Sequence, residues 1–97
     1  MKTYTVGILA CSIVRGLPGD LWAMEVRLQA SDRVLAAKKA YPNIRHLAYC
    51  VTDPTIKYLS VFSGLANDPS EAPQRMHPLR YNIATGELTD FGFVIAG

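Results

Sequence analysis

The sequence predicts a single two-layer α+β domain, in which a mostly antiparallel sheet carries one short helix on one face. Three observations lead to this class. The chain has 97 residues, which is enough for one hydrophobic core and too few for two. Its apolar residues alternate with polar ones over several segments, as they do in half-buried strands. Within Leu21–Tyr41 the alternation gives way to a helical period.

The first strand is predicted over Thr3–Val14, where β-branched and aromatic residues dominate. Both of its faces are largely apolar, which is typical of a central strand or of one whose second face meets a partner. Gly7 interrupts the strand and predicts a bulge or a close approach of another backbone. The connector Arg15–Asp20 is rich in turn residues, so we expect the next strand to return beside the first as a hairpin.

The stretch from Trp22 to Tyr41 joins a strand to a helix. Apolar residues alternate from Trp22 to Ala30, and the strand ends at a pair of capping residues, Ser31 and Asp32. The helix is expected from about Asp32 to Tyr41, and Pro42 is expected to end it.

Four more strands are expected after the helix, which gives the order strand, strand, helix, strand, strand, loop, strand, strand for residues 1–97. One short helix cannot cover six strands, so much of the second sheet face should remain open. The long loop, with its several prolines, is of a kind that is often functional. The expected segments are the strands Ile44–Thr52, Ile56–Ser63, Leu79–Ile83 and Glu87–Ile95, the turn Asp53–Pro54, the loop Gly64–Pro78 and the hairpin link Ala84–Gly86.

Composition argues against a disordered, a nucleic-acid-binding or a membrane-spanning protein. Hydrophobic residues make up 49% of the chain and charged residues 19%, which argues against disorder. The net charge is +2 and the basic residues are scattered, so direct nucleic-acid binding is not favoured. No apolar run approaches the length of a membrane span. Cys11 and Cys50 lie in apolar runs and are expected to be free, buried thiols of a cytoplasmic protein. The alternative is a disulfide between them, which requires the first and third predicted strands to be neighbours.

No pattern of catalytic or metal-binding residues stands out. In a strand, His46 and Cys50 would lie ~13 Å apart and could not form a catalytic pair. The histidines and cysteines have no metal-ligand spacing, and no glycine-rich phosphate loop is present. We therefore expect no enzyme, no metal and no cofactor.

One segment resembles a known family. The strand MEVRLQA followed by SDRVLAAKKAYPN resembles a strand–helix unit of small phage-encoded α+β proteins, including some type I anti-CRISPR proteins of similar length. The likeness covers about 20 residues of the 97 and carries over no functional residue. It implies an inhibitor that binds a large effector complex through surface contacts. The slightly basic charge favours occlusion of a protein surface over mimicry of DNA.

The leading hypothesis is a small non-enzymatic protein-binding module, such as an inhibitor of a nucleoprotein effector complex. Its expected contact residues combine cations with one apolar anchor on the open face and the long loop: Arg27, Lys57, Arg75, Met76 and Arg80.

Two alternatives from other classes stay open. In the first, a homodimer of open sheets encloses a small-ligand or enzyme pocket near His46, Tyr49 and Cys50. In the second, basic and aromatic side chains form a platform for single-stranded nucleic acid. The platform residues would be Arg27, Arg45, Lys57, Arg80, Tyr49, Tyr58 and Tyr81.

Overall fold

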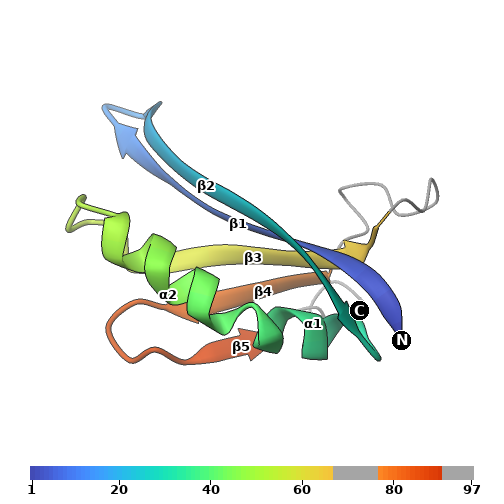
Figure 1. Cartoon of the computed structure of the whole chain (residues 1–97). Coiled ribbons are helices and arrows are strands. Elements are labelled where there is room, and N and C mark those ends of the chain that lie inside the picture. The colour runs from blue at the N-terminus through green and yellow to red at the C-terminus, as the bar shows by residue number, and fades with distance from the viewer. Residues whose placement is uncertain (67–76, 91–97) are drawn as a thin grey trace.

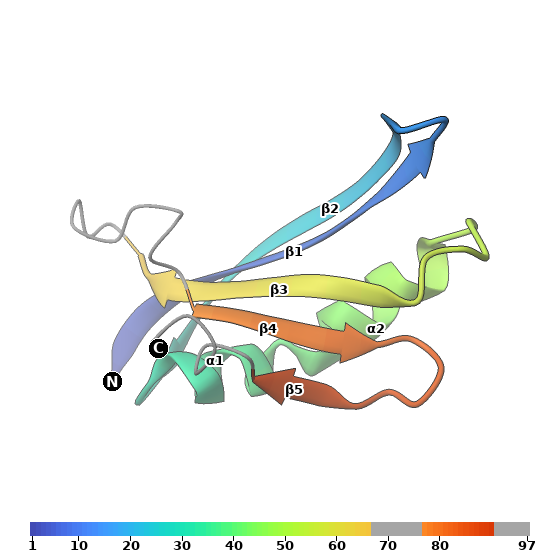
Figure 2. The ribbon, with the colours of Figure 1, turned by 180° about the vertical axis from the view of Figure 1, so that it is seen from behind.

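The computed structural model describes residues 1–66 and 77–90 and shows an antiparallel sheet with helices on one face (Figure 1, Figure 2). Within these residues the sheet has five strands in the order β2-β1-β3-β4-β5, and all four pairings are antiparallel. The α+β class and the antiparallel sheet are confirmed, but two helices replace the one predicted. The elements are β1 (Lys2–Val14), β2 (Leu17–Ala30), α1 (Arg33–Lys39), α2 (Tyr41–Cys50), β3 (Tyr58–Leu65), β4 (His77–Asn82) and β5 (Leu88–Asp90).

The core lies between the helices and the sheet face that they cover. Alternate residues of the strands point to this face, as the pleat requires. The predicted central place of the first strand is confirmed, because β1 lies between β2 and β3. The buried apolar residues are Tyr4, Val6, Ile8, Ala10 and Ala30 from β1 and β2, Ala36, Ala37, Ala40, Ile44 and Leu47 from the helices, and Leu59, Val61, Leu79 and Tyr81 from β3 and β4.

The β1–β2 hairpin is tighter than predicted. Arg15 and Gly16 alone form the turn, with φ of 52° and 79°, and Val14 pairs directly with Leu17. Two consecutive residues at positive φ form the type of turn that matches the twist of paired strands. The expected six-residue connector is therefore wrong, because most of it continues β2.

The bulge in this hairpin lies at a different position from the one predicted. The register shifts between Cys11 and Ile13, whereas pairing through Gly7 is regular. A Cβ added to Gly7 would meet nothing within 4 Å, so the close approach predicted there is absent. The close approach occurs at Gly19, where an added Cβ would lie 2.5 Å from the hydroxyl oxygen of Ser12.

Helix α1 begins as expected. Asp32 is the N-cap residue, and its carboxylate accepts a 2.8 Å hydrogen bond from the Leu35 backbone N–H. Lys38 and Lys39 lie in the last turn, where the helix dipole favours cations.

The third strand predicted over Ile44–Thr52 is wrong, because Tyr41–Cys50 forms helix α2. Pro42 does not end a helix. It lies in the first turn of α2, where backbone N–H groups have no partner within the helix, so the N–H that proline lacks is not needed. Ile44 and Leu47 recur at helical spacing and are buried against the sheet. A bend at Ala40, which ends α1 and precedes α2, separates the two helices.

The later strands agree better with the prediction. A turn at Asp53 leads into β3, and β4 and β5 form the expected hairpin, with Gly86 at φ 73°. The bounds of the loop predicted over Gly64–Pro78 are wrong at both ends, because β3 continues to Leu65 and β4 begins at His77. The rest of that loop and most of the last strand predicted over Glu87–Ile95 lie outside the described residues.

Neither described helix combines the length and the apolar character that crossing a membrane requires.

Candidate functional site

One face of the sheet carries no helix in the described part of the chain, and we call it the open face (Figure 2). Strand register places alternate residues of β1 to β4 on it. Its residues are Thr3, Thr5, Gly7, Leu9 and Cys11 of β1, Leu21, Ala23, Glu25, Arg27 and Gln29 of β2, Tyr58, Ser60, Phe62 and Gly64 of β3, and Pro78, Arg80 and Asn82 of β4.

A hollow of about 320 Å³ lies around Gly7 on the open face. Gly7 pairs with Glu25 on β2 and with Phe62 on β3, so a bare backbone is flanked by two larger side chains. Leu9 and Ala23 complete an apolar rim beside the Glu25 carboxylate. The hollow thus has the size and mixed lining of a seat for one side chain of a partner.

The tip of the β1–β2 hairpin extends beyond the rest of the sheet (Figure 1). Pairing between β1 and β3 stops at Leu9, so the last residues of β1 have only β2 beside them among the described strands. We call the part of the hairpin from Ala10 to Leu21 the hairpin tip. Four of its large apolar side chains are exposed. They are Ile13 at 65% exposed, Val14 at 56%, Leu17 at 68% and Leu21 at 65%.

The structure separates the contact residues predicted from the sequence. Arg27 on β2 and Arg80 on β4 both lie on the open face, three strands apart. The Arg80 guanidinium lies 4.7 Å from the centre of the Tyr58 ring. Lys57 is exposed just before β3, and Arg75 and Met76 lie outside the described residues.

The predicted nucleic-acid platform is not assembled as one surface. Arg27, Tyr58 and Arg80 lie on the open face. Tyr81 is buried beneath the helices, and Arg45 and Tyr49 are on α2, on the other side of the sheet. No single strand of nucleic acid could therefore stack on the whole set.

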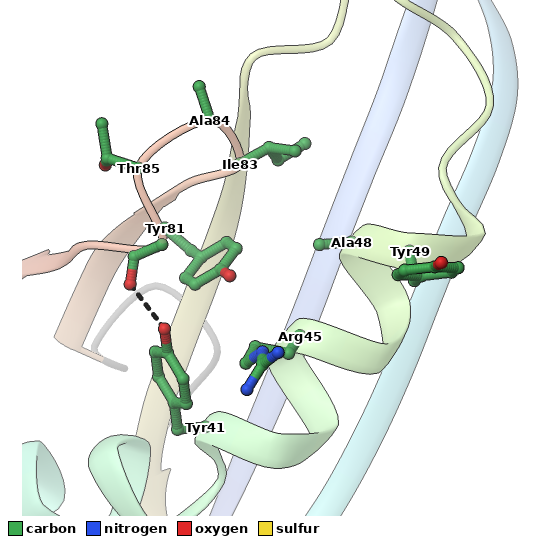
Figure 3. Close-up of a pocket in the computed structure, with 9 residues that line it drawn as sticks. Tyr41, Arg45, Ala48, Tyr49, Tyr81, Ile83, Ala84 and Thr85 are labelled. Carbon is green, nitrogen blue, oxygen red and sulfur yellow. Dashed lines mark hydrogen bonds between the residues drawn. The ribbon is translucent and has the colours of Figure 1, made fainter.

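A second hollow, of about 380 Å³, lies between α2 and the β4–β5 turn (Figure 3). The Tyr41 hydroxyl donates a 2.7 Å hydrogen bond to the Gly86 carbonyl, which holds the helix against the turn. The Tyr41 and Tyr81 rings meet edge to face, with centroids 5.8 Å apart. Arg45 projects beside them and supplies the cation of this hollow.

The environment of this hollow changes the acidity of Tyr81. Burial of the Tyr81 side chain raises its pKa above the usual value for tyrosine, and the neighbouring Tyr41 hydroxyl raises it further. The Arg45 charge acts in the opposite direction on the same pKa. Tyr81 therefore ionises only at a more alkaline pH than a solvent-exposed tyrosine does.

The predicted pocket residues His46, Tyr49 and Cys50 all belong to α2. His46 and Tyr49 line a shallow hollow with Pro42 and Arg45, whereas Cys50 lines neither hollow beside α2. In a helix, His46 and Cys50 are four residues apart on one side, ~5–6 Å between Cβ atoms, and not the ~13 Å of a strand. The reason for excluding contact between them was therefore wrong.

The two cysteines are free, but both are exposed and not buried as predicted. No group of three or more histidine, cysteine, aspartate or glutamate side chains that could hold a metal ion occurs among residues 1–66 and 77–90.

Sequence reasoning did not identify the hairpin tip or the Tyr41–Tyr81 hollow. The tip could have been found from Val14-Arg15-Gly16-Leu17, because a residue followed by glycine between apolar residues is typical of a two-residue hairpin turn. The hollow depends on α2, which the sequence reasoning placed in the sheet.

Comparison with known proteins adds no relative. A scan against protein-family models and searches of curated proteins and of solved structures found no match to this chain.

Proposed function

We propose that this chain is a small non-enzymatic protein-binding module that contacts a larger protein through its hairpin tip and the adjoining open face. The observation that carries the proposal is the exposure of Ile13, Val14, Leu17 and Leu21 on one projecting segment. Ile13 and Val14 are consecutive in β1 and point to opposite faces of the hairpin, so the exposed apolar side chains lie on both of its faces. Exposed apolar surface of this kind is unfavourable in water and typically marks an interaction site.

The shape of the tip defines the partner surface that it fits. A projecting two-stranded tip is convex, so its partner must offer a concave apolar cleft. Arg15 at the turn and Asp20 beside the bulge are exposed and supply polar contacts around the apolar centre. The hollow around Gly7 supplies a second contact point on the same continuous sheet.

The resemblance of the strand–helix unit to type I anti-CRISPR proteins names the first partner to test. On this proposal the chain is a phage-encoded inhibitor that occludes a protein surface of a crRNA-guided effector complex. The net charge of +2 supports occlusion of protein rather than mimicry of nucleic acid. We place the protein in the cytoplasm, where two free cysteines would remain reduced.

The test is binding to purified type I effector complexes, followed by interferometry, with the wild-type chain and two variants. Leu17→Glu introduces a charge at the hairpin tip and should weaken binding at least ~100-fold, as expected for a central apolar contact. Tyr49→Glu is the matched control, because Tyr49 is also an exposed apolar residue, 92% exposed, but lies on α2. Equal loss in both variants, or in neither, would contradict the assignment of the surface.

The cationic residues on and beside the sheet are tested in the same assay. Charge reversal of Arg27, Lys57 and Arg80 should slow association, because exposed charges mainly steer encounter. Unchanged association and dissociation rates would remove these three residues from the contact surface.

A second candidate function rests on the hollow between α2 and the β4–β5 turn. Three tyrosines, Tyr41, Tyr49 and Tyr81, line with Arg45 a volume of about 380 Å³, which is enough for a small organic anion. Binding of aromatic carboxylates, measured by calorimetry and lost in Arg45→Gln, would favour a small-ligand-binding protein. Absence of binding by the wild-type chain would exclude this candidate for that ligand class.

A further inference from the structure

Strand β2 forms one edge of the sheet, and no described strand pairs with its outer side. It spans 14 residues, whereas β5 at the other edge spans three described residues. A long strand with an unpaired side offers a row of backbone donors and acceptors to another chain.

Two hydrogen bonds identify the outward-facing backbone groups of β2. The Ala66 N–H donates to the Thr3 carbonyl, so Thr3 uses its backbone on the β3 side of β1. Thr3 pairs with Gln29, whose carbonyl accepts a 3.0 Å hydrogen bond from the Lys39 ammonium and is therefore also turned away from β1. Because the direction alternates along a strand, Glu25 and Arg27 also point their backbone N–H and C=O outward.

The charges of the Glu25 and Arg27 side chains make the edge of β2 complementary to the same edge of a second copy. Glu25 and Arg27 lie on the open face on either side of Val26, and both are exposed. In an antiparallel pair centred on Val26, Glu25 of each copy would lie opposite Arg27 of the other. Opposite charges in directly opposed positions stabilise strand pairing, and this arrangement supplies the pair twice.

We propose that a second copy of this chain pairs with the β2 edge, antiparallel and centred on Val26, to form one continuous sheet across a two-fold axis. Each Glu25–Arg27 pair would exchange two backbone hydrogen bonds, and the two Val26 residues would face each other between them. The interface is isologous, since the same residues contribute from both copies.

The helix-side face of β2 supports the same register. Met24, Val26 and Leu28 are only half-buried, although they point to the face that the helices cover. The proposed pairing sets Met24 of one copy opposite Leu28 of the other, so each apolar side chain gains an apolar neighbour. Burial of this half-exposed row adds a hydrophobic contribution to the backbone hydrogen bonds.

Other registers are disfavoured by the charges. A shift by two residues sets Glu25 opposite Glu25, or Arg27 opposite Arg27, and like charges directly opposed are destabilising. A shift by one residue would set the apolar face of one strand beside the polar face of the other. The Lys39 side chain occupies the Gln29 carbonyl and limits pairing beyond that residue.

The first test is a disulfide trap in a Cys11→Ser, Cys50→Ser background. Facing Val26 residues would have Cα atoms ~4.5 Å apart, within the range that a disulfide bridges. Val26→Cys should therefore form a covalent dimer under mild oxidation. Leu28→Cys is the matched control, because its two copies would lie ~13 Å apart along the strands and should remain monomeric. Met24→Cys with Leu28→Cys should cross-link again.

The second test leaves the buried face unchanged. Glu25→Lys or Arg27→Glu alone sets like charges opposite each other and should raise the dimer dissociation constant about tenfold or more in sedimentation experiments. The double variant Glu25→Lys, Arg27→Glu restores opposite charges and should return to the wild-type value.

Three results would overturn the proposal: no disulfide in Val26→Cys, equal cross-linking in Leu28→Cys, or failure of the double charge exchange to recover association. The outcome is separate from the proposed partner binding, because Leu17→Glu at the hairpin tip should weaken partner binding and leave the Val26→Cys dimer unchanged.

Discussion

The Tyr41 hydroxyl and the Gly86 carbonyl form a 2.7 Å hydrogen bond between residues 45 positions apart in the sequence. Removing the hydroxyl in Tyr41→Phe keeps the ring contact with Tyr81 and leaves the carbonyl without this donor. We expect a loss of about 1 kcal/mol in the free energy of unfolding, measured by chemical denaturation. Tyr49→Phe, at a ring 92% exposed, should change nothing. Equal effects in the two variants would contradict a specific role for this bond.

The raised pKa of Tyr81 predicts a loss of stability at alkaline pH. Its folded pKa lies above its unfolded value, chiefly because the side chain is removed from water. Its contribution is therefore fully present below the unfolded pKa, about 10, and is lost as pH rises through the folded pKa. Thermal unfolding of wild type and Tyr81→Phe across pH 9–11 should show a steeper decline for the wild type. Parallel curves would exclude Tyr81 as the source.

Replacing Gly7 should stabilise the protein. An added Cβ meets nothing within 4 Å, and glycine in a strand interior is entropically unfavourable. Gly7→Val should raise the free energy of unfolding by about 0.5–1 kcal/mol while filling the hollow on the open face. If the open face contacts the partner, binding should weaken in this more stable variant. A fall in stability would show that the backbone there needs glycine.

Replacing Gly19 should have the opposite effect. The added Cβ of Gly19→Ala would lie 2.5 Å from the Ser12 hydroxyl oxygen and 3.0 Å from a Val14 methyl carbon. Overpacking of this kind costs about 1–3 kcal/mol, measurable by denaturant unfolding. Ser12→Ala should recover part of the loss in the double variant, because the nearest clashing atom is gone. Additive effects of the two substitutions would indicate that they do not interact.

The cap of α1 can be assigned to one residue by substitution. The Asp32 carboxylate accepts the Leu35 N–H, so Asp32→Ala should cost about 1 kcal/mol of stability. The neighbouring Ser31→Ala is the control and should have little effect, since Ser31 is exposed and precedes the cap. A larger loss at Ser31 would contradict the cap assignment.

The strand–helix unit was the most predictable part of the chain. Alternation from Trp22 to Ala30 predicts β2, and Asp32 is one of the two capping residues that the sequence left open. The β4–β5 hairpin was predictable for a similar reason, because Gly86 adopts the positive φ that glycine favours. In each case one local rule decides the structure, and tertiary contacts agree with it.

The second helix was not predictable by the same means. Ile44, Leu47 and Tyr49 fit a short apolar run that periodicity alone cannot assign to helix or strand. Pro42 could end one helix or begin the next, and only packing of Ile44 and Leu47 against the sheet decides between them. The same error prevented prediction of the hollow between α2 and the β4–β5 turn, because Tyr41 and Arg45 line it only when α2 is a helix.

Because β1 is paired on both sides over only part of its length, the hairpin tip has a lower local free energy of opening than the rest of the sheet. Tyr4–Leu9 has neighbours on both sides, whereas Ala10–Val14 has only β2 among the described strands. A two-stranded ribbon is marginally stable in water. Amide hydrogen exchange should therefore be fast between Ile13 and Pro18 and slow at Val6 and Ile8. Ile13, Val14 and Leu17, which we assign to partner binding, thus lie where the sheet opens most easily, beyond the strand residues Val6 and Ile8 that the core buries.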